Sequence, residues 1–339
     1  MRKRDARCPG YLGWLAATVL IGLAVSACSG SSSPPTSGPA GGLILDINGP
    51  LSDPFFGAMK LGTDDAAKAL GVNYQYVAPA DVKNVVADYT RLLQESIGRH
   101  PAAMVVGDFV PSAFDPLIKQ AVDAGIPVVI VNSGADSWQK VGALTYVGEN
   151  ALVTGEAAGT FAAKAGVHHL VCVNHVAGNP QLNQRCQGAQ MTLSQAGGTS
   201  TVLNIPTADS GNPAAVQQDI QGFLTAHPET DGVLTLGSGI ATDAQAAIKA
   251  IGKTGQIKLG TTDVSTAVLQ AVKSGDISFD MDQQAYLQGF LSLEIAFQYL
   301  KYGIYPTQPI VTSGLVISKE NVDKALAVQQ QYPGSRGAR

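Results

Sequence analysis

The stretch LILDINGPLSDPFFGAMKLGTDDAAKALGVNYQYV, residues 43–77, decides the fold. Leu43–Asn48 is a short apolar run typical of a buried strand. Pro54–Leu70 is an amphipathic helix behind Asp53, a good N-cap residue, and its proline is tolerated in the first turn. Val72–Val77 has the composition of the next strand. A strand, a helix and a second strand in this order predict a βαβ unit and a parallel sheet.

The same alternation continues to the end of the chain and restarts after residue 150. It predicts an α/β protein with two similar, doubly wound parallel-sheet units. Further strands are predicted over Ala103–Gly107, Pro127–Asn132, Tyr146–Gly148, Leu170–Asn174, Thr201–Ile205, Gly232–Leu236, Ile257–Gly260, Ile277–Met281 and Ile310–Ile317. Further helices are predicted over Val82–Ile97, Asp115–Ala124, Ala151–Lys164, Gln184–Gln195, Ala214–Ala226, Ala241–Ala250, Ser265–Ser274 and Tyr286–Tyr302.

Polar and aromatic residues follow many of these strands. Open parallel sheets bind ligands at the carboxyl ends of their strands, so these residues are the candidates for a binding site. They are Asp53, Phe55, Phe56, Asp108, Asn132, the segment 179–185 with Asn183 and Arg185, Ser238, Asp263, Gln283 and Gln284. Some have structural alternatives, because Asp53 and Asp263 could each cap a helix, Arg185 could be structural, and Phe55 and Phe56 could belong to the core.

The N-terminus has the pattern of an export signal. Met1–Arg7 is basic, Tyr11–Val25 is uncharged and largely apolar, and small residues then lead to Cys28. The apolar stretch is too short to span a bilayer core of about 30 Å. The small residues ending in cysteine resemble the lipobox of bacterial lipoproteins. That resemblance implies a signal peptide over 1–27, a diacylglycerol on Cys28, and a protein lipid-anchored to the cell membrane on its extracytoplasmic face.

Composition narrows the class of protein further. Residues 28–42 are rich in Ser, Gly and Pro, which predicts a flexible tether, and the remaining chain of about 300 residues is long enough for two domains. The formal net charge is −4, with no basic cluster after the signal. Nucleic acid is therefore not an expected partner, because its binding needs a basic surface.

The four cysteines divide by position. Cys8 lies in the signal and Cys28 at the lipid site, which leaves Cys172 on a predicted strand and Cys186 on the following predicted helix. In an exported protein such a pair predicts a disulfide. The alternative is a reactive or metal-binding thiol pair, although no CxxC motif or histidine cluster accompanies it.

Several stretches together resemble the type I periplasmic sugar-binding proteins, the ribose-binding-protein group. The stretches are Leu51–Phe56, Gly125–Val129, Val147–Asn150, Ala226–Thr230, Gly260–Asp263 and Asp282–Gly289. The resemblance implies two α/β domains, 43–148 with 284–312 and 149–283 with 313–339. It places three crossovers between them, near Gly148–Ala151, Phe279–Gln283 and Pro309–Leu315.

The resemblance also assigns roles in the first domain. Asp53 stands where the family often has a ligand-binding Asn, and Phe55 and Phe56 match aromatics that pack on the sugar ring. Asn132 falls where ribose binders carry Asp. Here Asn132 and Ser133 replace a paired Asp-Arg, so the resemblance leaves ribose itself in doubt.

In the second domain Asp263 and Gln283 match ligand-contacting positions of the family. Asn183 falls where ribose binders carry an Arg, with Arg185 as the neighbouring alternative. The region Asp209–Asn212 offers no counterpart of the family's pocket Phe. Amide, carboxylate and guanidinium groups suit adjacent sugar hydroxyls, and aromatic faces cover the C–H surface.

We therefore expect a monomeric lipoprotein that captures a monosaccharide or polyol between its domains and delivers it to an ABC transporter permease. It would need no cofactor or metal. The alternative is a receptor of the same fold that signals to a membrane kinase or chemoreceptor. The lipid signal counts against a transcription-factor sensor. An enzyme is not expected, because the chain has no GxSxG, HExxH or phosphate-loop motif.

Overall fold

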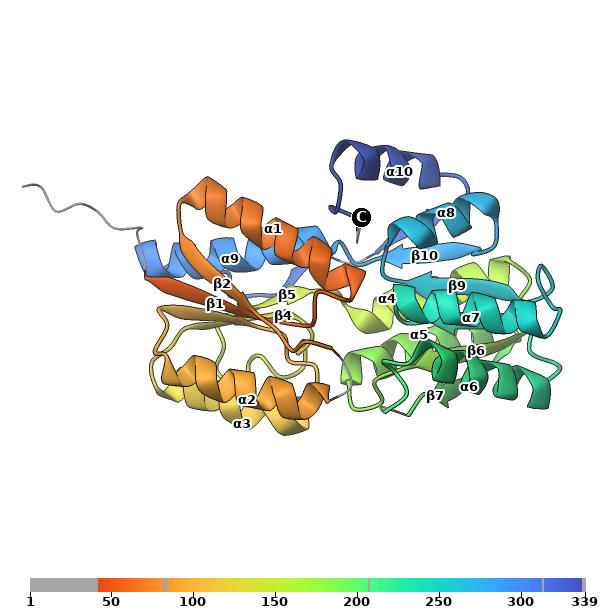
Figure 1. Ribbon diagram of the computed structural model, residues 1–339, viewed down its shortest axis with the longest axis horizontal. Coiled ribbons are helices and arrows are strands. Elements are labelled where there is room, and N and C mark those ends of the chain that lie inside the picture. The colour runs from red at the N-terminus through yellow and green to blue at the C-terminus, as the bar shows by residue number, and fades with distance from the viewer. Residues whose placement is uncertain (1–41, 82–83, 207, 313, 337–339) are drawn as a thin grey trace, which may run out of the picture. The chain divides into compact units, whose positions relative to one another are not determined.

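The computed structural model describes residues 42–81, 84–206, 208–312 and 314–336. Strands and helices alternate along the chain, and the strands form two six-stranded sheets (Figure 1). This arrangement confirms the predicted fold class of two similar α/β units. Within the described ranges, none of the helices combines the length and apolar character that crossing a membrane requires.

The first sheet and its helices form what we call the N-terminal lobe. Its strands are β1 (Leu43–Ile47), β2 (Asn73–Val77), β3 (Ala103–Val106), β4 (Val128–Asn132), β5 (Tyr146–Gly148) and β11 (Ile310–Val311). They lie in the order β11-β5-β4-β3-β1-β2, and all neighbours are parallel, with Ile44 opposite Tyr74 in β2 and Ala103 in β3.

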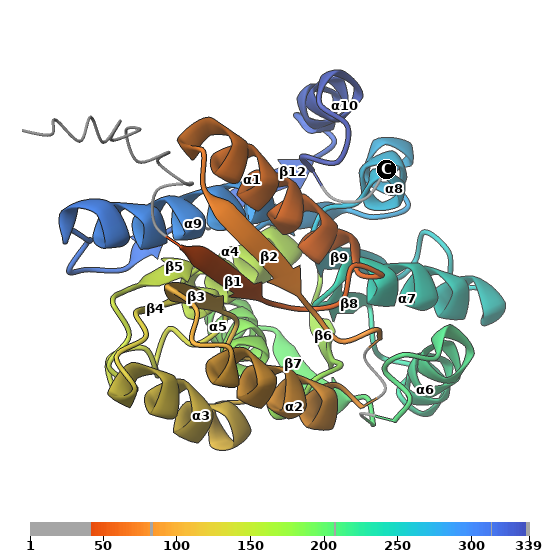
Figure 2. The same ribbon diagram turned by 60° about the vertical axis from the view of Figure 1, so that its left-hand side comes forward.

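Four helices cover the two faces of this sheet. They are α1 (Pro54–Leu70), α2 (Val85–Gly98), α3 (Pro111–Asp123) and α9 (Ala285–Tyr302). The helices α1 and α9 pack on one face and α2 and α3 on the other (Figure 2). Each face therefore has its own apolar core, one around Met59 and Leu293 and one around Leu93 and Phe114.

The second sheet and its helices form the C-terminal lobe. Its strands are β6 (His169–Asn174), β7 (Thr199–Asn204), β8 (Gly232–Thr235), β9 (Lys258–Thr262), β10 (Phe279–Asp282) and β12 (Leu315–Ser318), in the order β12-β10-β9-β8-β6-β7. Only the β10–β12 pair of this described sheet is antiparallel. The helices are α4 (Ala151–Lys164), α5 (Pro180–Gln195), α6 (Pro213–Ala226), α7 (Ser238–Ala250), α8 (Thr266–Ser274) and α10 (Val322–Gln331).

The chain passes between the lobes three times. Glu149 and Asn150 join β5 to α4, Gln283 and Gln284 join β10 to α9, and residues 312–314 join β11 to β12. These passages agree with the three crossovers that the resemblance implied. The residue boundaries of the two domains stay predictions, because sheet membership alone does not assign the connectors.

Most predicted elements agree with the structure to within a few residues, with two differences late in the chain. Ile310–Ile317 was predicted as one strand, and this is wrong, because β11 and β12 lie in different sheets. Gly314 has a φ of 110°, which only glycine adopts readily, so the chain changes direction between β11 and β12. The helix α10 was not predicted at all.

The start of α1 is set by local chemistry. The side chain of Asp53 accepts a hydrogen bond from the N–H of Phe55 at 2.9 Å, and Pro54 occupies the first turn. Gly71 ends the helix with a φ of 67°. The cap therefore fixes Phe55 and Phe56 beside the carboxyl end of β1.

Glycines bring one pair of helices into close contact in each lobe. A Cβ atom on Gly62 or Gly289 would lie 1.9 or 2.0 Å from a backbone carbonyl oxygen of the facing helix, α9 or α1 respectively. Gly155 and Gly188 have the same role between α4 and α5, where added Cβ atoms would lie 2.1 and 2.2 Å from carbonyl oxygens. No larger side chain fits these positions unless the helices separate.

A disulfide fixes α5 to the second sheet. Cys172 of β6 and Cys186 of α5 are bonded, with their Cα atoms 5.7 Å apart. The predicted pairing is thus present, and the alternative of a free reactive or metal-binding pair does not apply to this structure. The bond anchors the helix that carries Gln181 and Arg185.

We expect Gly62→Ala to lower the free energy of unfolding by about 1–3 kcal/mol, because the added methyl group overpacks the α1–α9 contact. Urea denaturation followed by circular dichroism measures this change. Gly57→Ala in the same helix is the control, because a Cβ there meets nothing within 4 Å. It should be neutral or stabilise by up to about 1 kcal/mol. Equal effects of the two substitutions would contradict the close-contact interpretation.

Candidate ligand-binding site

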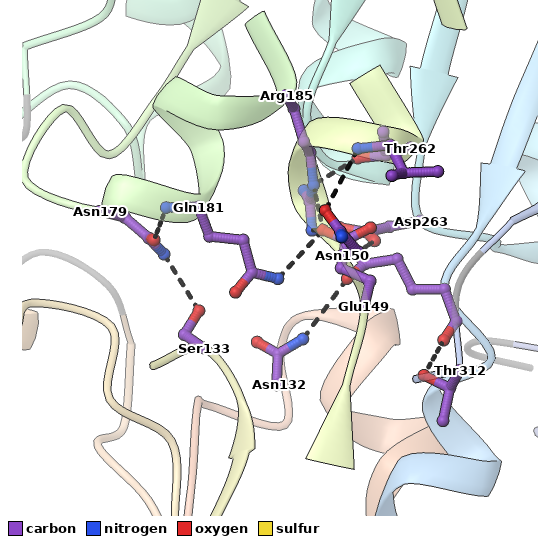
Figure 3. Close-up of polar contacts among 12 residues, drawn as sticks. Asn132, Ser133, Glu149, Asn150, Asn179, Gln181, Arg185, Thr262, Asp263 and Thr312 are labelled. Atoms are coloured by element: carbon purple, nitrogen blue, oxygen red, sulfur yellow. Dashed lines mark hydrogen bonds and ion pairs between the residues drawn. The ribbon is translucent and has the colours of Figure 1, made fainter. Parts of the chain in front are cut away.

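A buried ion pair lies where the first connector meets the C-terminal lobe (Figure 3). Arg185 of α5 and Glu149 of the connector have side-chain exposures of 3% and 0%, and both Nε and Nη2 of Arg185 lie 2.5 Å from Glu149 Oε1. Gln181 Nε2 donates to the same oxygen at 3.0 Å, and Arg185 Nη1 donates to Thr262 Oγ1 at 3.2 Å. These hydrogen bonds compensate the loss of water around the two charges.

A second chain of contacts joins the two lobes through Gln283. Its Nε2 donates to Asp263 Oδ1 of the C-terminal lobe. Asn132, at the end of β4 in the N-terminal lobe, donates to Gln288 Oε1 at 3.3 Å and lies 3.5 Å from Gln283 Oε1. Thr312 of the third connector donates to the carbonyl oxygen of Gln283 at 3.0 Å. Residues from both lobes and from the third connector therefore meet around Gln283 of the second connector.

Asn132 and Asp263 have unusual backbone conformations. Their φ angles are 62° and 77°, in the left-handed region that non-glycine residues seldom occupy. Asn and Asp tolerate this region better than other side chains. Such positions are found often at functional sites. Here Asn132 ends β4 and Asp263 directly follows β9, and each directs a polar side chain to Gln283.

The electrostatics of the junction are dominated by burial. Burial raises the pKa of the Asp263 carboxyl to about 7, while Arg185 opposes the shift and Asp53 adds to it. Burial also raises the pKa of Asp53. Burial, with help from Arg185, lowers the pKa of His175 to about 4, so this imidazole is neutral near pH 7.

The predicted aromatic residues lie together beside this cluster. Phe55 is 5% exposed and, with Asp263 and Gln283, lines a cavity of about 10 Å³ between the lobes. Phe56 packs edge-to-face on Phe55 and on Phe109, with ring centroids 5.2 and 5.6 Å apart. The cavity is no larger than one water molecule needs, so the lobes are closed on one another here.

Two further contacts join the lobes on another side of the junction. Asn179 Nδ2 donates to Ser133 Oγ at 3.3 Å, and Gln184 Nε2 donates to Asp136 Oδ2 at 2.6 Å. Asp108 is fully buried and accepts a hydrogen bond from Ser137, which belongs to the loop after β4 that also carries Ser133 and Asp136. The structure therefore places Asp108 as a support of the loop rather than in the cluster around Gln283.

The structure also separates the two alternatives on α5. Asn183 is exposed, accepts a hydrogen bond from Asn174 Nδ2 at 2.7 Å and donates to the Ala177 carbonyl at 3.3 Å. Arg185, on another side of the same helix, is buried in the ion pair with Glu149. The junction thus contains Arg185 and not Asn183.

Sequence reasoning missed several polar residues of the junction. They are Glu149, Thr262, Gln288, Thr312, His175 and Arg336, whereas Gln181 lay within the candidate segment 179–185 without being singled out. For Thr262 and His175 a signal existed, since both stand at the carboxyl end of a strand. Among the described residues, no group of three His, Cys, Asp or Glu side chains is arranged to hold a metal ion.

The model of the periplasmic binding protein domain matches residues 47–303, which include most strands of both sheets and the connectors with Glu149 and Gln283. This chain belongs to the periplasmic binding protein family. Its two lobes and three connectors are those of the type I fold. Membership in a family of binding proteins agrees with the expectation that the chain is not an enzyme.

Relatives with known names match most of the chain. The xylose/arabinose-binding protein of Sulfolobus acidocaldarius is 26% identical over 87% of this chain and 75% of its own. The ribose import binding protein of Salmonella typhimurium is 25% identical over 82% of this chain and 91% of its own. The resemblance to this family that the sequence motifs indicated is thereby confirmed.

Solved structures extend the comparison to the fold. A carbohydrate transporter from Acidothermus cellulolyticus, in complex with myo-inositol, is 31% identical and has a TM-score of 0.79, covering 87% of this chain and 99% of that one. An ABC transporter solute-binding protein from Agrobacterium vitis, bound to α-D-tagatopyranose, is 25% identical with a TM-score of 0.75, covering 84% and 97%.

The raised pKa of Asp263 predicts a pH dependence of stability. Its carboxyl has a pKa of about 7 in the folded protein and an ordinary value of 3.8, so the folded state holds the proton more tightly. That contribution to stability is present at low pH and is lost as the pH rises through about 7. We expect the midpoint of thermal unfolding to fall between pH 5 and pH 7.5, and to fall less in Asp263→Asn.

The exposed Asp123→Asn is the control and should keep the pH dependence of the parent protein. Asp46 and Asp108, whose pKa values burial raises to about 6 and about 7, act in the same direction, so Asp263→Asn should reduce the slope without removing it. An identical slope in Asp263→Asn and the parent would show that Asp263 titrates normally.

Proposed function

We propose that this protein captures a neutral monosaccharide or cyclitol between its lobes and delivers it to the permease of an ABC transporter. The observation that carries the proposal is a set of buried polar atoms without hydrogen-bond partners among the described residues, in the first connector and in segments that follow strands of the C-terminal lobe. They are Glu149 Oε2, Gln181 Oε1, Ser238 Oγ and His175 Nδ1. Buried polar atoms are normally paired, and sugar hydroxyls can both donate to and accept from them.

The charges of the junction favour a neutral ligand. Both nearby guanidiniums are already paired, Arg185 with Glu149 and Arg336 with Asp282. Asp53 and Asp263 form no ion pair within the described part of the chain. A carboxylated or phosphorylated sugar would therefore find no unpaired guanidinium here, and it would be repelled by Asp53 and Asp263 whenever these carboxyls are ionised.

The relatives support the ligand class without fixing its identity. Their names refer to xylose, arabinose and ribose, and one related structure holds myo-inositol. All of these are neutral polyols. Asn132, in place of the Asp of ribose binders, removes a charge from the N-terminal lobe, so we do not single out ribose.

A bound ligand would replace hydrogen bonds that the protein makes with itself in the closed structure. Gln283, Asp263 and Asn132 bond to one another here, and the cavity beside them holds about 10 Å³. A sugar needs far more room than this, so the lobes must separate to admit it. Its hydroxyls would then replace these hydrogen bonds, and contacts to both lobes would favour the closed state.

We expect a neutral polyol to stabilise the purified protein in a thermal-shift screen of myo-inositol, D-xylose, D-ribose and D-glucose. A ligand at a hundred times its dissociation constant adds about 2.7 kcal/mol. D-Glucuronate serves as the anionic comparison and should have no effect. Stabilisation by glucuronate alone would contradict the neutral-ligand proposal.

Calorimetry on variants then tests the site with the best polyol of the screen. Asp263→Ala should weaken binding by roughly 1–3 kcal/mol, because it leaves a ligand hydroxyl unpaired. Asn183→Ala is the matched control, because this side chain is exposed and bonds to Asn174 and Ala177 rather than to the cluster around Gln283. Its affinity should equal that of the parent. Equal losses in both variants would place the site elsewhere.

We also propose that the protein is a monomer held by a lipid on Cys28 at the extracytoplasmic face of the cell membrane. The support is the N-terminal pattern of a basic segment, an apolar segment and small residues before Cys28. Cys28 and the predicted tether up to residue 41 lie outside the described residues.

Cys28→Ala should abolish lipid attachment, so the protein should move from the detergent phase to the aqueous phase in Triton X-114 partitioning. Cys8→Ala is the control and should partition like the parent, because Cys8 lies in the predicted signal. Retention of Cys28→Ala in the detergent phase would refute the lipid site.

A further inference from the structure

The segment that follows α10 turns back towards the junction of the lobes. We call Tyr332–Arg336 the C-terminal strap. The N–H of Tyr332 donates to the Val328 carbonyl at 2.7 Å, and the N–H of Ser335 donates to the Tyr332 carbonyl at 3.1 Å. The N–H of Arg336 donates to Gln329 Oε1 on α10 at 3.1 Å. The strap is therefore attached to the C-terminal lobe, where α10 packs beside α8 (Figure 2).

The strap also reaches the N-terminal lobe. Ser335 and Arg336 line the same small cavity as Phe55 of α1, Asp263 and Gln283. Further along α1, a Cβ atom placed on Gly334 would lie 3.4 Å from Leu61 Cδ2. The C-terminal strap thus lies against α1 in the closed structure and forms one wall of this cavity.

Arg336 holds the second connector through Asp282. Its guanidinium forms an ion pair with Asp282 Oδ2, with side-chain exposures of 26% and 6%. The other carboxylate oxygen of Asp282 accepts the N–H of Gln284 at 2.7 Å, and Gln284 has a φ of 60° as the chain enters α9. One carboxylate therefore joins the strap to the turn that presents Gln283.

We propose that the C-terminal strap is a latch for lobe closure and that Arg336 is a positioning residue for the ligand. By holding Asp282, Arg336 keeps Gln283 aligned with Asp263, and the strap lying on α1 opposes separation of the lobes. The latch slows release of the bound polyol. Its effect on the ligand rests on the proposed function, whereas its effect on closure does not.

Hydrogen exchange of the unliganded protein tests closure alone. In Arg336→Gln, amides in peptides covering residues 55–65 and 279–290 should exchange faster than in the parent. Lys273→Gln is the matched control, because Lys273 also forms an ion pair in this lobe, with Asp323 of α10 at 2.9 Å, but both side chains of that pair are exposed. Lys273→Gln should leave the exchange rates of both peptides unchanged. Unchanged exchange over residues 55–65 in Arg336→Gln would overturn the latch.

Binding of myo-inositol, or of the best polyol of the screen, tests the positioning role. Arg336→Gln should raise the dissociation constant by roughly three- to tenfold, mainly through a faster dissociation rate, since the lost contact is a partly exposed charged hydrogen bond. Arg336→Lys keeps the charge and should restore part of the affinity. Added salt should weaken binding by the parent more than binding by Arg336→Gln.

A double-mutant cycle with Asp282→Asn completes the test. If Arg336 acts through Asp282, the double variant should lose no more affinity than the more affected single variant. Additive losses, or no rescue by lysine in a variant with the parent's circular dichroism spectrum, would overturn the positioning role. If no polyol binds the parent, the proposed function fails, while hydrogen exchange still decides the latch.

Discussion

The buried pair of Glu149 and Arg185 is the contact on which the rest of the junction depends. Removing two charges from water costs several kcal/mol per ion, so the pair is tolerable only with close geometry and further hydrogen bonds. Gln181 and Thr262 supply them. Because Glu149 stands on a connector and Arg185 on α5, the requirement to keep them together fixes how the chain leaves the N-terminal lobe.

The two lobes have the same local structural features at equivalent positions. Asp53 and Asn179 each cap a helix that begins with proline after the first strand of its lobe. Asn132 is the last residue of the fourth strand of its lobe and Asp263 is the first residue after the fourth strand of the other, both with positive φ. Parallel sheets expose the carboxyl ends of their strands at one edge, so two similar sheets facing each other bring matching polar residues to one place.

Much of the fold and part of the candidate site could be predicted because they depend on local sequence patterns. Strand and helix alternation located both sheets, and the strand-end rule selected Asp263 and Asn132. Helical spacing could also have decided between Asn183 and Arg185, since Arg185 is four residues from Gln181 and shares its side of α5. Both contact Glu149, whereas Asn183 is exposed and donates to the Ala177 carbonyl.

The features that could not be predicted depend on contacts between residues far apart in sequence. The pairing of Arg336 with Asp282 spans 54 residues, and no local pattern indicates it. The run Ile310–Ile317 was predicted as one strand, although its two halves belong to different sheets. A pattern of apolar residues indicates a strand but does not indicate which neighbouring strand it pairs with.

The glycine contacts between α1 and α9 and between α4 and α5 have a consequence for the cost of capturing a ligand. With backbones in direct contact, neither helix pair can slide or tilt freely, so each lobe behaves as one solid piece. Any change in the position of one lobe relative to the other must be absorbed by the few torsion angles of the connectors, which include Glu149–Asn150, Gln283–Gln284, Thr312 and Gly314. Enclosing a small molecule then orders few backbone bonds, and little of the favourable contact energy is lost to entropy.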